Sequence, residues 1–509
     1  MKLNEFELGA EDARNLNLRS ESQRSDFLRS FVTPRGFKLD DFFSGKKFFV
    51  LGTKGTGKTA LLQFIRIKSE AELNAITGFY YFQSGFRTSE LEQFKAALLK
   101  DLSSGDVLFN DPKFRNEDEI PVFWRIFLLS ETSKLLKRAG VIEGPVQDFY
   151  EAVETLKSAA KSKTVGKKYP ALKRFKGKAA LNPSIEVEGE IEAADMQDFE
   201  SLIEDAENAL DKVSLEKQPV FMFVDELEVY QSNDDTEELK MPAVASLVRA
   251  VRDFNERFFE TDIRIIAAVR SEVVTEVSVV QGEVYRIATG RGIEIGWSNT
   301  ELNGLHPLEK IIISHLAAQD PEISGEDVDL TAAMLDTALT KYFPSKASLR
   351  NVLNLTWYRP RDMALVFEIA QSMDGDFDCF RKQTLSFSVL KKLGERMLID
   401  AKAGLGVKYK PYEIDAMDRV LRGGQNSYSR KEFQLRIDDL ADQYDDVALL
   451  SDNRWTEVVN DLYKVGILCV ENTNSKFIHF HHRGDSIPSL TDDFLIKVNR
   501  SLVKTLSIS

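Results

Sequence analysis

The stretch Gly52-Thr53-Lys54-Gly55-Thr56-Gly57-Lys58-Thr59 stands between an apolar run, Phe48-Phe49-Val50-Leu51, and a helix-forming segment that begins at Ala60. Glycines allow the backbone to turn so that several N–H groups point inward and form a nest for an anion. A helix that starts directly after the turn adds its first N–H groups and the positive end of its dipole. The stretch therefore predicts a strand, a phosphate-binding loop and a helix, in that order.

The same eight residues match the whole P-loop pattern, G-x-x-x-x-G-K-[ST]. Lys58 is predicted to reach the β- and γ-phosphates of ATP, and the Thr59 hydroxyl is predicted to bind Mg²⁺. The backbone from Gly52 to Ala60 is predicted to surround the phosphates. A chance glycine-rich turn is the alternative, but the strand before the loop and the helix after it argue against chance.

An acidic pair, Asp225-Glu226, follows a second apolar run at residues 220–224. Such a run predicts a buried strand, and we expect it to lie beside the strand that ends at Leu51. Asp225 would hold Mg²⁺ through water, and Glu226 would polarise the attacking water. The glutamate favours hydrolysis over nucleotide binding alone, although an aspartate at a strand end is common in itself.

Three arginines are candidates for contact with the phosphates. Arg270 ends a third apolar run, residues 263–269, where it would lie close to the γ-phosphate and stabilise its charge. Arg359-Pro360-Arg361-Asp362 lies in a helical region further along the chain. A guanidinium on a separate small domain contacts the phosphates only when that domain closes, which would couple hydrolysis to a rigid-body movement. Arg361 is the first candidate and Arg359 the second; the alternatives are a surface role for Arg270 and a capping turn at Asp362.

Composition bounds the class of protein. The chain has 509 residues, which predicts two to four domains, and its hydrophobic and charged contents are those of a globular protein. No apolar run approaches the length of a membrane span, and the first residues lack a signal-peptide core. Two distant cysteines predict no disulfide framework, so we expect a cytoplasmic protein. The net charge of −14 disfavours a general nucleic-acid coat but allows a local basic patch.

The predicted fold class is α/β: a parallel-sheet P-loop core, a helical lid and a C-terminal winged-helix domain. Apolar runs alternate with helical segments up to residue 298, and the strands then stop until a hairpin near residues 466–481. The predicted parts are a lead-in at 1–45, the core at 46–298 with an insertion at about 155–216, the lid at 299–380, a connector helix at 381–409, and the winged-helix domain at 410–509.

The insertion carries a basic stretch bounded by Lys157 and Lys178, followed by acids alternating with apolar residues from Glu186 to Glu192. Lysines on an irregular segment could contact the phosphate backbone of a nucleic acid. The alternative is a solvated basic loop that pairs with the acidic segment after it. Few aromatic residues are available there to stack on bases, which favours the second interpretation.

The P-loop, Val224-Asp225-Glu226, Arg270 and Arg359-Pro360-Arg361-Asp362 together resemble the AAA+/STAND ATPases, initiator-like branch. Residues 1–400 look similar to bacterial P-loop ATPases often met in phage-defence and mobile-element contexts. The resemblance implies an assembly or conformational switch powered by ATP and Mg²⁺, acting as a homo-oligomer or with an effector protein. In ring-forming members an arginine before the last core strand reaches a neighbour's site, which makes Arg286 and Arg291 candidates here.

Other functions remain open at this stage. A DNA-binding initiator or loader would use the winged helix on DNA, but its third predicted helix, residues 454–465, carries acids where major-groove contact needs basic or amide side chains. We therefore favour a protein-contact or autoinhibitory role for that domain. A P-loop kinase would need an arginine-rich substrate lid and has no use for a winged helix. A scaffold with a dead site is disfavoured by Lys58, Thr59, Asp225 and Glu226.

Overall fold

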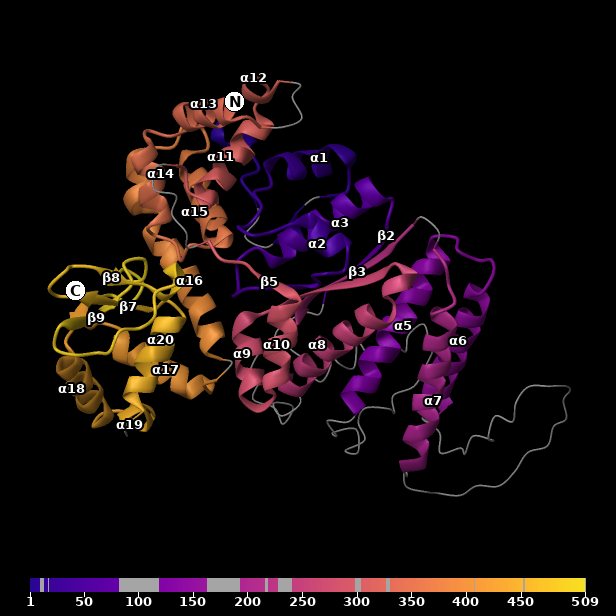
Figure 1. The fold of residues 1–509 in the computed structure, drawn as a ribbon. Coiled ribbons are helices and arrows are strands. Elements are labelled where there is room, and N and C mark those ends of the chain that lie inside the picture. The colour runs from indigo at the N-terminus through magenta and orange to yellow at the C-terminus, as the bar shows by residue number, and fades with distance from the viewer. Residues whose placement is uncertain are drawn as a thin grey trace, which may run out of the picture.

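A five-stranded, all-parallel sheet covered by helices organises the first half of the chain (Figure 1). The computed structural model describes residues 1–9, 13–16, 18–81, 119–162, 193–215, 218–227, 240–297, 304–325, 330–406, 408–451 and 454–508. The fold class is α/β, as predicted. The helix expected near 88–102, most of the basic stretch and the acidic strand after it lie outside the described residues.

The strand order is β2-β3-β4-β1-β5. The strands are β1 (Phe49–Leu51), β2 (Ile76–Tyr81), β3 (Val220–Leu227), β4 (Ile263–Val269) and β5 (Gly292–Glu294). The expectation that β3 lies beside β1 is wrong, because β4 pairs with both: Ala267 is opposite Phe49 on one side and opposite Val224 on the other. Three similar apolar runs predict three buried strands, but nothing in their composition orders them.

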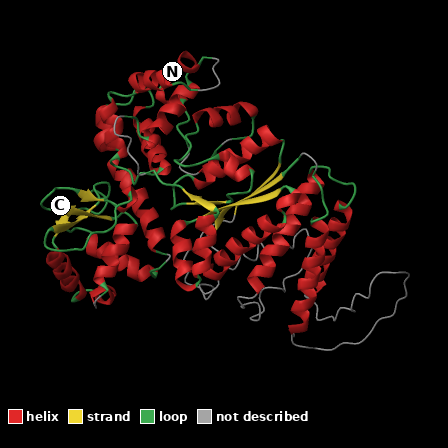
Figure 2. Ribbon diagram, in the orientation of Figure 1, coloured by secondary structure: helices red, strands yellow, loops and turns green. Residues whose placement is uncertain are grey.

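Both faces of the sheet are buried, which explains the unbroken apolar runs. Along β3, Phe221 and Phe223 join one hydrophobic core, and Met222 and Val224 join the other. Helix α3 (Lys58–Leu73) covers the first face with α1 (Glu21–Ser30) and α2 (Leu39–Phe43). On the opposite side lie α5 (Glu119–Arg138), α8 (Lys240–Arg257), α9 (Ser271–Val280) and α10 (Gly282–Gly290), and further out α6 (Val146–Ser162) and α7 (Ala193–Leu210) pack against α5 (Figure 2).

A helical unit follows the sheet. It consists of α11 (Pro307–Gln319), α12 (Pro321–Ser324), α13 (Ala332–Tyr342), α14 (Lys346–Leu353) and α15 (Pro360–Asp374). The N-terminus belongs to this unit as much as to the sheet (Figure 1). Gln319 exchanges two hydrogen bonds with the backbone of Glu7, and Gln371 donates to the Leu3 carbonyl at 2.6 Å. The first residues therefore bind the helical unit, and α1 then leads the chain back to the sheet.

Helix α16 (Leu390–Leu405) connects the helical unit to a C-terminal unit, which runs from α17 through β9 to Ile508. Its helices are α17 (Pro411–Leu421), α18 (Arg430–Ala441), α19 (Asp445–Ser451) and α20 (Trp455–Lys464). Its antiparallel sheet has the order β6-β9-β7-β8, with β6 (Ser427–Tyr428), β7 (Leu468–Asn472), β8 (Ile478–His479) and β9 (Phe494–Val498). The sequence predicted the β7–β8 hairpin and three of the helices but missed α19, β6 and β9.

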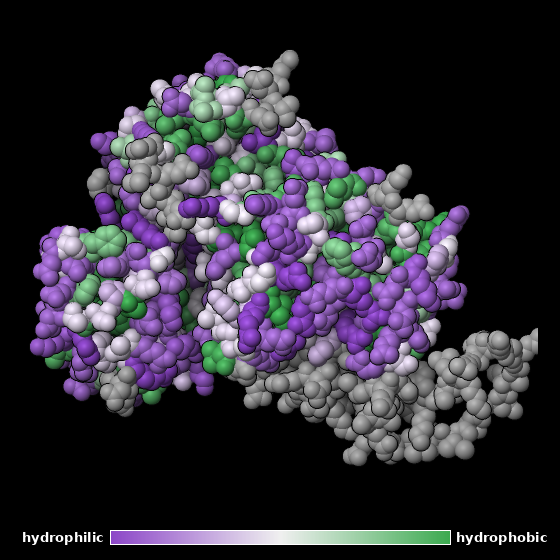
Figure 3. Space-filling view, in the orientation of Figure 1, coloured by the Kyte–Doolittle hydropathy of each residue, from purple (hydrophilic) through white to green (hydrophobic). Residues whose placement is uncertain are grey.

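Polar residues dominate the face seen in the space-filling view, where apolar side chains gather only in small groups (Figure 3). Among the described residues, no helix combines the length and the apolar character needed to cross a membrane.

Candidate functional site

A cavity of about 250 Å³ opens at the carboxyl edge of the parallel sheet. Its walls come from five parts of the chain: the glycine loop (residues 52–57) with the start of α3, the ends of β3 and β4, the segment after β5, the helical unit, and the N-terminal segment. The polar residues along it include Lys54, Lys58, Thr59, Asp225, Arg270, His315 and Arg361. Ligands of open parallel sheets bind at this edge, so the cavity is the first candidate for a functional site.

The glycine loop has the backbone that the sequence predicted. Gly55 and Gly57 have φ values of +83° and +93°, a left-handed conformation that side chains with a Cβ adopt at a cost. Gly57 is the N-cap of α3 and brings no side chain to the first-turn N–H groups. The Lys58 ammonium donates to the carbonyls of Gly52 at 2.8 Å and Thr53 at 2.9 Å. Loop, helix start and lysine thus converge on one end of the cavity.

Two buried charged residues face the loop from the sheet. Asp225 is 1% exposed and Arg270 is 3% exposed, and both line the cavity. Charged groups that are buried and line a cavity are candidates for functional residues. Asp225 and the Thr59 hydroxyl are oxygen donors of the kind Mg²⁺ binds, in addition to water and phosphate oxygens. Both therefore fit the predicted Mg²⁺ ligands; the Glu226 side chain lies outside the described part.

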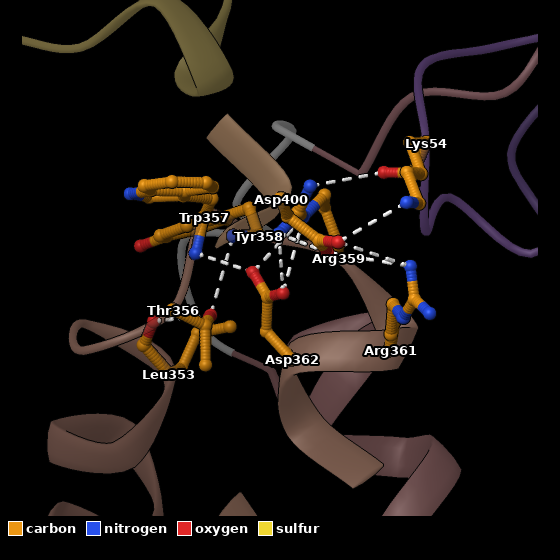
Figure 4. A network of polar contacts seen from close by, with 9 residues as sticks. All are labelled: Lys54, Leu353, Thr356, Trp357, Tyr358, Arg359, Arg361, Asp362 and Asp400. Carbon is orange, nitrogen blue, oxygen red and sulfur yellow. Dashed lines mark hydrogen bonds and ion pairs between the residues drawn. The ribbon is translucent and has the colours of Figure 1, made fainter. Parts of the chain in front are cut away.

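The two arginines at the start of α15 have different surroundings (Figure 4). Arg359 donates to Asp362 at 2.7 Å and to the Lys54 carbonyl at 3.0 Å, and its guanidinium lies 4.8 Å from the Trp357 ring centre. Burial alone would lower the pKa of Arg359, but the neighbouring carboxylates outweigh it and raise the pKa. Arg361 instead lines the cavity. Arg361 thus remains the candidate phosphate contact, and Arg359 holds the turn to the glycine loop.

Asp362 does not act as a simple cap. Arg359 is the N-cap residue of α15, and Asp362 lies in the first turn, where it accepts a hydrogen bond from the Trp357 N–H at 2.8 Å. Its side chain is only 2% exposed. The capping alternative was therefore right about a structural role for Asp362 and wrong about its position.

Asp400, on α16, was missed by the sequence analysis. Its carboxylate pairs with Lys54 and Arg361 at 3.3 Å each and with Arg359 at 3.7 Å (Figure 4). Burial would raise the pKa of Asp400, but the charges of Arg359, Arg361 and Lys54 outweigh it and lower the pKa. In the sequence Asp400 is one polar position of an amphipathic helix, and no local signal distinguishes it.

Arg286 and Arg291 do not line the cavity of their own chain. Arg291 directly precedes β5, whose first residue, Gly292, is opposite Phe49 at the start of β1. It therefore lies at the amino edge of the sheet, away from the glycine loop, and pairs with Glu256 at 3.4 Å. Arg286 is exposed on α10. Any contact of either arginine with a phosphate would have to be made in another copy of the chain.

The end of the cavity away from the sheet is mostly apolar. It is lined by Leu8, Phe27, Phe31, Val32, Pro34, Ile311 and Ala364, with His315 among them. Desolvation lowers the pKa of His315 to about 4, so its imidazole is neutral at neutral pH. Trp297 lies beside the glycine loop and donates its Nε1–H to the Thr56 carbonyl at 3.0 Å. Phe27, Phe31, Val32 and Pro34 belong to the lead-in, for which the sequence leaves contact with a nucleotide base and simple packing equally open. The other residues were not predicted as site residues.

No protein-family model matches the chain, and no curated protein matches it either. Within the described ranges, no three His, Cys, Asp or Glu side chains are grouped so as to hold a metal ion by themselves.

Proposed function

We propose that this protein is a Mg²⁺-dependent ATPase that acts as an assembly or conformational switch. One observation carries the proposal: a single cavity is lined both by Lys58 and Thr59, at the helix start after the glycine loop, and by Asp225 and Arg270, at the carboxyl edge of the parallel sheet. The loop and helix start suit a polyphosphate, and the buried acid and hydroxyl suit its metal. The resemblance to AAA+/STAND ATPases agrees with this site but does not carry the argument.

Each residue has a proposed role. Lys58 exchanges the carbonyls of Gly52 and Thr53 for the β- and γ-phosphates, and the loop N–H groups bind the same anion. Thr59 and Asp225 hold Mg²⁺, which neutralises charge on the phosphates when it is bound. Arg270 stabilises charge on the γ-phosphate. Glu226 orients the attacking water, a role assigned from its position after Asp225 on β3.

The rest of the cavity suits the nucleoside. Phe31, which lines the cavity, stacks on Phe64 of α3 with ring centres 4.3 Å apart. This contact attaches the N-terminal segment to the helix that follows the glycine loop. The neutral imidazole of His315 can donate or accept a hydrogen bond without adding charge. We propose that the base lies at this apolar end, between the N-terminal segment and the helical unit.

We propose that the C-terminal unit is a winged helix that contacts protein. Its order of helices followed by a β7–β8 hairpin supports the winged-helix assignment. On α20, Glu457 and Asp461 both pair with Lys408 at 2.6 Å. That helix therefore carries acids, Asp461 among them only 9% exposed, where reading of DNA bases would need basic or amide groups. Arg286 and Arg291 are exposed. The proposal therefore includes a homo-oligomer in which one of these arginines contacts the nucleotide bound to a neighbouring copy of the chain.

Turnover of Mg-ATP by the purified chain tests the proposal. We expect Lys58→Ala to abolish turnover and binding, and Glu226→Gln to abolish turnover while binding survives. Lys68→Ala, on the outer side of α3 where Lys68 pairs with Glu72 at 3.1 Å, is the matched control and should change neither. Equal turnover by the wild type and the Lys58→Ala variant would contradict the assignment. Stimulation by double-stranded DNA would favour the initiator-type alternative.

A further inference from the structure

Asp400 joins three parts of the chain that are far apart in the sequence. It lies on α16, while its partners lie on the glycine loop (Lys54) and at the start of α15 (Arg359 and Arg361) (Figure 4). Its side chain is 15% exposed, so the pairs are shielded from solvent and screened little by salt. A carboxylate thus stands directly behind two cations that line the candidate nucleotide cavity, Lys54 and Arg361.

The ion pairs of Asp400 differ in how easily they can be exchanged. Arg359 keeps a 2.7 Å contact with Asp362, its bond to the Lys54 carbonyl and its stacking on Trp357, whatever Asp400 does. Lys54 and Arg361 approach Asp400 only to 3.3 Å, longer than the 2.7–2.9 Å of a strong charge-assisted bond. These two contacts are therefore the ones that another anion can replace.

Helix α16, which carries Asp400, packs against the C-terminal unit. A side chain at Gly394 would collide with the Ser501 carbonyl, so the two segments lie in close contact. Thr505 donates to the Lys391 carbonyl at 3.4 Å, and Lys402 pairs with Asp418 of α17 at 3.3 Å. The helix that carries Asp400 is therefore packed against the C-terminal unit along much of its length.

We propose that Asp400 competes with the terminal phosphate of a bound nucleoside triphosphate for Lys54 and Arg361, so that nucleotide binding releases α16 and the C-terminal unit from the glycine loop. The inference rests on the proposed function. A triphosphate brings more negative charge than Asp400 and reaches both cations from the cavity side. Since binding free energies are reciprocal, the contact that weakens nucleotide binding is itself weakened by the nucleotide.

Binding of Mg-ATP and Mg-ADP to three variants tests the competition. Asp400→Asn should bind Mg-ATP about tenfold more tightly than the wild type, within the usual range of such couplings, and should gain less for Mg-ADP. Glu395→Gln makes the same charge change at an exposed position of α16 and should bind like the wild type. Equal or weaker binding by Asp400→Asn, with binding still sensitive to Lys58→Ala, would overturn the competition and leave the ATPase proposal standing.

A second measurement uses the wild type and does not depend on the variant's folding. Backbone amides of residues 390–405 should exchange hydrogen faster with Mg-ATP bound than with Mg-ADP bound. Unchanged or slower exchange would overturn the proposal. If neither the wild type nor Asp400→Asn binds nucleotide in a manner sensitive to Lys58→Ala, the proposed function itself fails and the competition fails with it.

Discussion

Arg359 and Arg361 are two residues apart, but we expect their removal to affect different properties: stability in the first case and nucleotide binding in the second. Replacing Arg359 with alanine takes away the partner of Asp362, whose carboxylate is 2% exposed. Replacing Arg361 with alanine takes away a group that lines the cavity and contacts Asp400 at 3.3 Å. We expect the first change to destabilise the helical unit and the second to weaken nucleotide binding with little effect on stability.

The magnitudes follow from burial. Breaking a buried ion pair by removing one partner costs about 3–5 kcal/mol, because the remaining charge is left uncompensated. Asp362 would then keep the Trp357 N–H but lose three contacts from one guanidinium. Arg361 is 19% exposed, and its contact is longer and shared, so about 1 kcal/mol or less is expected from it. Asp400 would retain Lys54 and Arg359.

Native-state hydrogen exchange of α15 amides measures the difference directly. A loss of 3–5 kcal/mol corresponds to an increase of about 100- to 5000-fold in the opening equilibrium of α15. Arg361→Ala should change it by less than about tenfold, and titration with Mg-ATP should show its loss of affinity. Comparable exchange in the two variants would refute the division of roles between the arginines.

Three further predictions concern the loop, the pH dependence and assembly. Gly55→Ala should lower stability by about 1–2 kcal/mol, because Gly55 has a left-handed φ. It should also weaken Mg-ATP binding measured by calorimetry, because the new Cβ would lie 3.1 Å from Arg361 side-chain atoms. Gly423 also has a left-handed φ but has open space around it, so Gly423→Ala should show only the loss of stability. The depressed pKa of His315, about 4 against 6.5, means that the unfolded chain binds the proton more readily. Its contribution to stability in urea should therefore be full above about pH 6.5 and fall by up to about 3 kcal/mol as pH drops towards 4. His315→Gln should remove this contribution, while those of His481 and His482, whose pKa values burial also lowers, should remain. Light scattering with a slowly hydrolysed ATP analogue should show assembly that Arg286→Ala or Arg291→Ala reduces, whereas a strict monomer under all conditions would exclude contact in trans.

The parts of the site that the sequence predicted are those that local chain geometry enforces. A glycine loop between a strand and a helix places Lys58 and Thr59 at a helix start wherever the rest of the chain goes. Asp225 and Arg270 each end an apolar run, and the carboxyl ends of parallel strands share one edge of the sheet. The strand order was predicted wrongly, since β4 lies between β3 and β1. Asp225 and Arg270 still lie at the same edge of the sheet as the glycine loop, because the strand order does not change which edge the carboxyl ends occupy.

What the sequence could not predict depends on contacts between distant segments. Asp400 resembles any polar position of an amphipathic helix until α16 is placed against Lys54 and Arg361. Arg359 and Arg361 look equivalent in a short motif, and only the burial of Asp362 separates them. The N-terminal segment gave no periodic signal for the helical unit, since its attachment uses backbone groups of Leu3 and Glu7 rather than a pattern of side chains.

These contacts also decide what a moving helical unit would have to break. Besides the bond from Arg359 to the Lys54 carbonyl, the Arg361 N–H donates to the Gly55 carbonyl at 3.3 Å. The turn before α15 is therefore bound to the backbone of the glycine loop, a bond that a phosphate in the loop's N–H nest does not compete for. Asp400 is bound to side chains, Lys54 and Arg361, which a phosphate does attract. On this geometry a nucleotide would leave α15 seated on the loop and displace α16. Movement should therefore begin at the C-terminal unit, whose own contacts with the segment before α15, such as the 3.2 Å bond from Arg483 to Asn354, would also have to open.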